Sequence, residues 1–157
     1  MILIKKLDQY EDYYIHLCDP IKNNIIPDGN FFRIIYSTHD VTLNGIYLEI
    51  ELKNVTCEKH YNKYKYSFNV NTHNDLINKI KNIEESLLNK ITFNKKSCFK
   101  IYEQFLNGNL KLFAESQSHK NMRVVLKISG IWENEDNYGL TYKFIHINED
   151  CYPSVLK

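Results

Sequence analysis

The residues of this chain with the clearest chemical potential lie in segment 63–70, where aromatic and basic side chains alternate. Successive side chains of a β-strand point to opposite faces of a sheet. A strand here would separate the lysines from the apolar side chains: Lys63 and Lys65 against Tyr64, Tyr66, Phe68 and Val70. Rings and cations on a sheet surface can hold unpaired bases and their phosphates. The segment therefore indicates either a surface for single-stranded nucleic acid or an ordinary strand whose ring face is core.

Two further places combine cations or rings in predicted strands. Arg123 and Lys127 share one face of a strand predicted over residues 123–131. The last predicted hairpin supplies Trp132, Tyr142 and Lys143. Stacking of one base on an aromatic ring contributes about 1–3 kcal/mol, and Lys or Arg adds a salt-dependent term. A few exposed rings therefore suffice for useful affinity, although core packing of the rings and solvation of the cations is the alternative at each place.

Motifs for enzyme chemistry are missing from the sequence. There is no Gly-x-Ser-x-Gly and no glycine-rich phosphate loop. Ser37, His39 and Asp40 lie in a turn-like stretch, where such residues are common. Glu49 and Glu51 share one strand face, which is the expected solvent side of an amphipathic strand. The sequence thus predicts a protein that is not an enzyme, with no catalytic residues and no cofactor.

The four cysteines, Cys18, Cys57, Cys98 and Cys151, are widely spaced and contain no CxxC pair. Cys57 and His60 form a single CxxH half-site, so no metal site is predicted. The first residues lack an apolar segment followed by a small-residue cleavage site, and no run is long enough for a membrane helix. We therefore expect an intracellular protein with reduced cysteines and no membrane partner.

Composition limits the class of nucleic-acid binder that the chain can be. Its 157 residues suit one domain, and 20 basic against 19 acidic residues give a net charge of +1. Near-neutrality argues against a polybasic protein but permits a basic face balanced by an acidic one. Abundant Asn, Ile, Lys and Tyr are typical of AT-rich codons. Part of the Lys and Tyr excess is therefore mutational bias.

Hydrophobic periodicity predicts seven main strands and one main helix. Apolar residues repeat every three or four positions between residues 74 and 91, as on an amphipathic helix. A short helix is also expected between Leu7 and Leu17, and Asn107-Gly108-Asn109 has the composition of a hairpin turn. The predicted strands cover residues 31–37, 46–55, 63–70, 98–106, 110–115, 123–131 and 138–147.

Three strands, a helix and four strands, mostly joined by short turns, predict a mainly β protein with one packed helix (α+β). An OB-like antiparallel β-barrel with an extended C-terminal hairpin fits this order, and a plain sheet with a packed helix is the competing geometry. The whole chain, 1–157, is predicted to be a single domain. Its parts are an N-terminal extension (1–30), a barrel core (31–147) and a tail (148–157).

Residues 123–133, continued by 138–145, resemble the C-terminal hairpin of small proteins carried by large DNA viruses and related mobile elements. Over residues 31–147 the plan is similar to the OB-type single-stranded DNA-binding proteins of viruses and phages. The resemblance implies sequence-tolerant binding of displaced strands, in support of replication or recombination, in the cytoplasm or nucleus of a host cell. It implies a binding surface formed by Tyr64, Tyr66, Arg123, Lys127, Trp132, Tyr142 and Lys143.

Phage-type members of that class often end in a strongly acidic tail, whereas this chain ends in a segment with two acids and a terminal lysine. Two alternatives to DNA binding are open: an RNA ligand, or a viral structural or host-interaction protein that binds another protein through a Tyr-rich surface. An unpaired edge strand would also permit a homo-oligomer.

Overall fold

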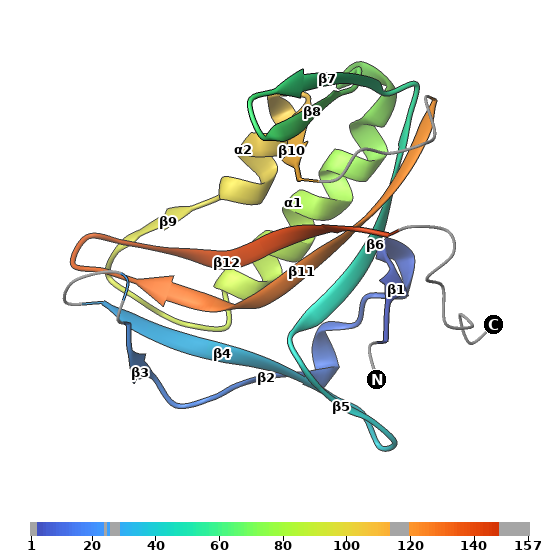
Figure 1. The fold of residues 1–157 in the computed structure, drawn as a ribbon. Helices are drawn as coiled ribbons and strands as arrows, with labels where there is room; N and C mark the ends of the chain where they lie inside the picture. Colours follow the sequence, from blue (N-terminus) through green and yellow to red (C-terminus); the bar gives the residue numbers. More distant parts are fainter. Residues whose placement is uncertain (1–2, 24, 26–28, 114–119, 148–157) are drawn as a thin grey trace.

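The computed structural model describes residues 3–23, 25, 29–113 and 120–147 (Figure 1). These residues form two sheets and one main helix, which confirms the predicted class of a mainly β protein with a packed helix. The predicted tail, residues 148–157, and Cys151 within it lie outside the described residues. The described parts of segment 1–30 include three short strands that join the larger sheet.

The larger sheet has nine strands among the described residues, and β11 (Asn121–Glu133) lies at its centre. On one side β11 pairs with β12 (Asn137–His146). On its other side it pairs first with β6 (Ile46–Lys53) and then with β4 (Asn30–Ser37), always antiparallel. Short strands extend the sheet from these four: β1 (Lys5–Lys6), β2 (Ile15–Leu17), β3 (Ile21–Lys22), β5 (Thr42–Asn44) and β9 (Lys96–Cys98).

The smaller sheet has the strand order β10-β8-β7 and stands at one end of the molecule, near α2 (Figure 1). Its strands are antiparallel: β7 (Thr56–His60), β8 (Lys63–Ser67) and β10 (Asn109–Leu112). The described strands do not close either sheet into a barrel. The predicted OB-like barrel is therefore not confirmed.

The main helix, α1 (Asn74–Leu88), lies behind β11 and β12 in the view of Figure 1 and covers one face of the larger sheet. Its buried apolar residues repeat at three and four positions, which confirms the predicted helix. They are Ile77, Ile80, Ile83, Leu87 and Leu88. A second helix and three short 3-10 turns complete the fold: α2 (Lys100–Leu106), η1 (Leu7–Gln9), η2 (Asp12–Tyr14) and η3 (Asn71–His73).

A β-bulge interrupts the pairing of β11 with β12. The register shifts between Ile128 and Gly130, which leaves Ser129 as the extra residue. On the side of α1, β11 presents a continuous buried row: Met122, Val124, Leu126, Ile128 and Ile131. The opposite face of β6, β11, β12 and β4 points away from α1, and we call it the open face.

Three predicted elements are wrong: the strand over 98–106, the hairpin turn at Asn107-Gly108-Asn109 and the helix between Leu7 and Leu17. Segment 98–106 is not a strand, because most of it forms α2, with Ile101 and Phe105 buried one helical turn apart. Gly108 ends that helix at φ +71°, so the Asn-Gly pair forms a helix terminus rather than a hairpin. In addition, the polar segment 56–60, for which no strand was predicted, forms an exposed strand. The helix expected between Leu7 and Leu17 is replaced by η1, η2 and β2.

Glu84 explains why α2 begins where it does. Its side chain is buried on α1, and its two carboxylate oxygens accept the backbone N–H groups of Ile101 (3.1 Å) and Tyr102 (2.9 Å). The first N–H groups of a helix have no partner within that helix. Burial raises the pKa of Glu84, and these two hydrogen bonds oppose the rise. A carboxylate from one helix therefore caps the other.

Replacing Glu84 by Ala is expected to lower the free energy of unfolding by roughly 1–3 kcal/mol, because two buried N–H groups lose their acceptor. Glu84→Gln should lie between wild type and Ala, since an amide oxygen can still accept one of them. Urea unfolding measures both. Glu85→Ala, on the exposed side of the same helix, is the control and should change stability by less than about 0.5 kcal/mol. Equal effects of the two Ala variants would contradict the capping role.

A second buried carboxylate, Glu133 at the end of β11, joins β4 to the loop after α1. It accepts hydrogen bonds from Asn30 Nδ2 (2.8 Å) and Lys95 Nζ (2.7 Å). Burial alone would raise the pKa of Glu133, but the bonds from Lys95 and Asn30 together lower it below its ordinary value. The folded state thus favours the ionised carboxylate.

Because the pKa of Glu133 is lower in the folded state than in the unfolded state, its ionised form stabilises the fold above the ordinary carboxyl pKa of 4.5. This contribution is lost as the pH falls through the lower, folded value. Unfolding free energies measured by urea between neutral and acid pH should show wild type losing its advantage over Glu133→Gln. A constant difference between the two proteins across this range would contradict the assignment.

Candidate nucleic-acid interface

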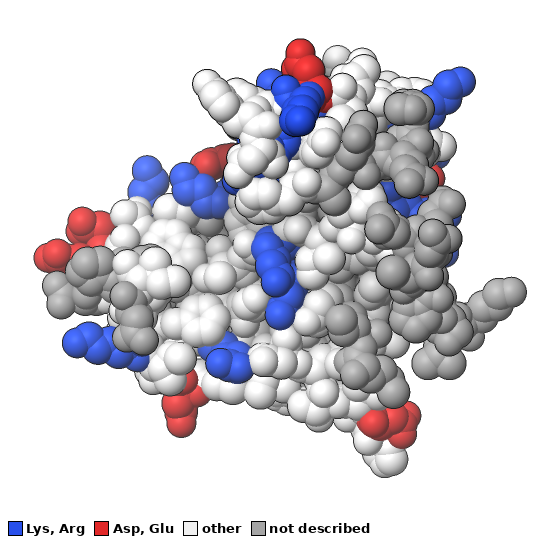
Figure 2. Space-filling view, in the orientation of Figure 1, with Lys and Arg blue, Asp and Glu red and all other residues white. Residues whose placement is uncertain are grey.

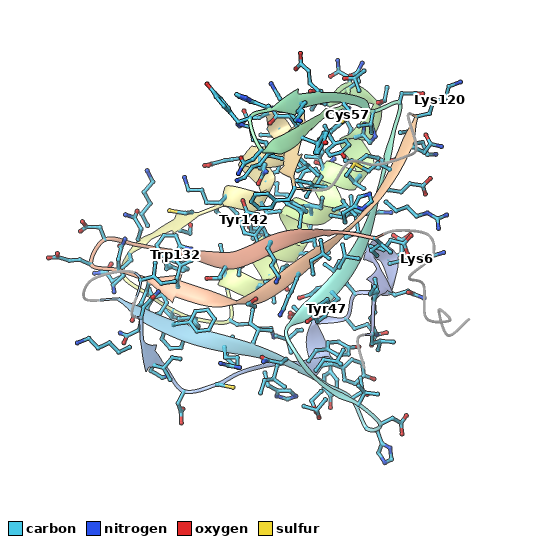
Figure 3. The ribbon with its side chains drawn as sticks, in the orientation of Figure 1. Lys6, Tyr47, Cys57, Lys120, Trp132 and Tyr142 are labelled. Atoms are coloured by element: carbon cyan, nitrogen blue, oxygen red, sulfur yellow. The ribbon has the colours of Figure 1, made fainter. Side chains whose placement is uncertain are left out.

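The structure divides the predicted binding residues among three surfaces. The open face of the larger sheet brings four of them together: Arg123, Lys127, Trp132 and Lys143. Tyr142 lies on the opposite face of β12, toward α2 (Figure 3). Residues 63–66 belong to the smaller sheet. These nine residues therefore do not form a single site.

The rings of β8 face the core. Tyr66 is only 1% exposed and lies opposite the buried Leu110, and Tyr64 is half-buried against the same core. A ring that is sealed in this way cannot stack on a base, which corrects the prediction for Tyr66. Because side chains alternate along the strand, Lys63 and Lys65 lie on the outward face of the smaller sheet, away from these rings.

Tyr142 connects β12 to α2. Its hydroxyl donates a hydrogen bond to Gln104 Oε1 (2.8 Å), and its ring meets Phe144 edge-on with centroids 5.8 Å apart. Burial, followed by the negative charges of Glu84 and Glu103, raises the pKa of Tyr142. The structure therefore does not bring Tyr142 together with Trp132 or Lys143.

The centre of the open face consists of three adjacent cross-strand rows. Paired residues of an antiparallel sheet share a face, so the register identifies the neighbours. The rows are Tyr47–Lys127–Lys143, Arg33–Gly130–Thr141 and Phe31–Trp132–Gly139. These rows hold three aromatic rings and three cations, and no acidic residue. Phe31, Arg33 and Tyr47 were not among the predicted site residues.

Two of the rings lie over glycines of adjacent strands. A Cβ built on Gly139 would be 2.9 Å from the Trp132 ring, and one on Gly130 would be 2.5 Å from the Phe31 ring. Each ring therefore occupies space that a side chain would otherwise fill. Phe31 and Trp132 are half-buried, as expected for rings that have one side against the backbone. Rings held in this way on a sheet offer a stacking surface that needs little reorganisation.

The charges of Lys127 and Lys143 are poorly compensated. The two lysines are directly opposite one another, an arrangement that is unfavourable for like charges. The Lys127 ammonium lies 5.3 Å from the centroid of the Tyr47 ring. Within the described part of the chain neither lysine forms an ion pair. Figure 2 shows Lys and Arg side chains over the middle of this face and Asp and Glu toward its edges.

Arg123 lies at the margin of this region, beside acidic residues. Its Nε is 3.6 Å from Glu49 Oε1, and its side chain is 55% exposed. Glu51 is its direct neighbour on β6. The charge of Arg123 is therefore partly balanced, unlike the charges of Lys127 and Lys143.

The groups considered for catalysis do not assemble. Ser37 Oγ lies 3.0 Å from Thr42 Oγ1, while His39 and Asp40 contact each other in a solvent-exposed turn. Among the described residues there is no cluster of three or more His, Cys, Asp or Glu suited to a metal ion. No helix in the same residues is long and apolar enough to cross a membrane.

Together the fold and this surface define an α+β protein with a basic, aromatic sheet face. No protein-family model matches the chain, and comparisons with curated proteins and with solved structures gave no match either.

Replacing Gly130 by Ala is expected to destabilise the protein by about 1–3 kcal/mol, the usual effect of overpacking. The new Cβ would lie 2.3 Å from the Phe32 carbonyl oxygen and 2.5 Å from the Phe31 ring. Urea unfolding followed by Trp132 fluorescence measures the loss. Thr141→Ala, an exposed change in the same row, should have almost no effect, and an equal loss in both variants would contradict the packing argument.

Proposed function

We propose that this protein is a non-enzymatic single-stranded DNA-binding protein that holds the strand on the open face of its larger sheet. The observation that carries the proposal is the group of three adjacent rows that combine three rings with three cations and no acid. Rings supply stacking surfaces for bases and cations supply partners for phosphates. Both are needed by a protein that binds a flexible polyanion.

The spacing on β12 suits a bound strand of a few nucleotides. Lys143 and Gly139, on which Trp132 rests, are four residues apart, or about 13 Å at roughly 3.3 Å per residue. Bases would stack on Trp132 and Phe31 while phosphates contact Lys127 and Lys143. Every base has a π-face, so binding of this kind tolerates different sequences. This is the property that displaced strands require during replication or recombination of a viral-type genome.

The proposal does not depend on a closed barrel. OB-type proteins bind strands on a sheet face, and we propose that the open face acts as the counterpart of that surface in an OB-like plan. A protein partner is the alternative occupant. Exposed tyrosines such as Tyr13 on η2 favour it, although they lie outside the three rows.

Titration with oligothymidylate at low salt is expected to quench the fluorescence of Trp132, the only tryptophan, because a base stacks on its ring. In anisotropy measurements with a labelled oligonucleotide, Trp132→Leu should weaken binding by about 1–3 kcal/mol. Lys127→Ala combined with Lys143→Ala should reduce the steepness of the salt dependence by about 0.7 per lysine.

The matched control removes two lysines from α1, behind the sheet, as Lys79→Gln with Lys81→Gln. It should leave both affinity and salt dependence close to wild type. Binding that is absent at low salt, or that both double variants weaken equally, would contradict the proposed function. Capture of a protein that survives nuclease treatment, together with no oligonucleotide binding, would favour the protein-partner alternative.

A further inference from the structure

The outward face of the smaller sheet repeats the chemistry of the open face. Lys65 on β8 lies directly opposite Lys111 on β10, just as Lys127 lies opposite Lys143. The Lys63 ammonium is 4.8 Å from the centroid of the Phe113 ring, comparable to Lys127 over Tyr47. Each of these two faces thus presents one pair of facing lysines and one lysine over a ring. Unlike the three rows of the open face, this arrangement includes an acidic residue, Glu58 on β7, which pairs with Lys65.

Two rings on this surface are far more exposed than any ring of the three rows. Phe113 is 72% exposed, and Tyr61, in the turn between β7 and β8, is 87% exposed. Tyr61 stacks on His60 with ring centroids 4.9 Å apart. These rings are not needed by the core, so their position calls for a different physical reason.

The backbone of Tyr61 is also unfavourable. Its φ of +59° lies in the left-handed region, which Gly, Asn and Asp adopt far more readily than an aromatic residue. The β7–β8 turn therefore holds a large exposed ring at a position where a smaller residue would suit the fold better. Strain of this kind concentrates at functional sites.

We infer that the outward face of the smaller sheet is a second contact region for the same single strand, formed by Tyr61, Lys63, Lys65, Lys111 and Phe113. This inference rests on the proposed function of the open face. In one view of the molecule, Lys and Arg side chains are visible both over the β7–β8 hairpin and over the middle of the open face (Figure 2). The two groups therefore lie on the same side of the molecule, as a single strand that contacts both requires.

Two linked contacts make affinity depend on the length of the strand. A short strand can occupy one region, while a longer strand binds the second region intramolecularly and gains from a high effective concentration. The open face, which has more rings in adjacent rows, is the region that short strands occupy. The second region then adds both affinity and steeper salt dependence for long strands only.

The test compares labelled oligothymidylates of about 6 and about 30 nucleotides, lengths chosen to lie near the lower limit and beyond the upper limit of the roughly 4–16 nucleotides that one OB-fold covers. Lys65→Ala combined with Lys111→Ala should weaken binding of the long strand about tenfold to a hundredfold and leave the short strand unchanged. Lys79→Gln with Lys81→Gln again serves as the matched control, because it removes the same charge from α1. It should affect neither length.

Tyr61→Asn separates folding from binding. Asn adopts positive φ more readily, so the melting temperature should stay the same or rise, while affinity for the long strand falls. The second contact region is contradicted if wild type binds the long strand no better than the short one. It is also contradicted if the Lys65/Lys111 double variant and Tyr61→Asn both bind the long strand as tightly as wild type. In either case the proposed function of the open face stands. If wild type binds neither strand, the proposed function and this inference both fail.

Discussion

Packing of α1 against one face of the larger sheet is the interaction on which the rest of the structure depends. The buried row of β11 and the apolar side of α1 remove a large apolar area from water, and burial of this kind is the dominant favourable term in folding. Because α1 covers only one face, the other face of the same strands is available for a different composition. The positions of the rings and lysines on the open face therefore depend on packing at the opposite face of the same strands.

Much of this arrangement could be predicted from the sequence. Alternation in β6, β11 and β12 and the three-to-four spacing in α1 are strong local signals, and the structure has those elements close to the predicted bounds. The structure separates Tyr142 from Lys143, which were predicted for one binding surface, because neighbouring residues of β12 point to opposite faces. Alternation could not show which face of β8 is exposed to solvent. Tyr and Phe recur at every second residue whether they form a core face or a binding face. Tyr66 is buried for this reason.

Other features depend on contacts between distant residues. Segment 98–106 is rich in residues that also form strands, and its helix is fixed by the Glu84 carboxylate and by Gly108. Phe31, Arg33 and Tyr47 stood in correctly predicted strands, but only the register shows that they adjoin Trp132 and Lys127. The two buried carboxylates have hydrogen-bond donors within reach, whereas the open-face lysines face one another. Buried charge is compensated inside this protein, and surface charge is left for the solvent or a ligand.

The extra residue in β11 determines which side chains of the last hairpin point outward. Lys127 and Trp132 are five positions apart, an odd number, and in a regular strand they would point to opposite sides of the sheet. Ser129 changes that parity, so that both reach the same surface while Ile131 turns inward. If Ser129 were present without a bulge, regular alternation would turn Trp132 inward and Ile131 outward, whereas removal of Ser129 would leave Lys127 and Trp132 four positions apart and on the same side. The bulge that accommodates Ser129 therefore keeps the aromatic and basic halves of the surface together in a strand whose residue count would otherwise separate them.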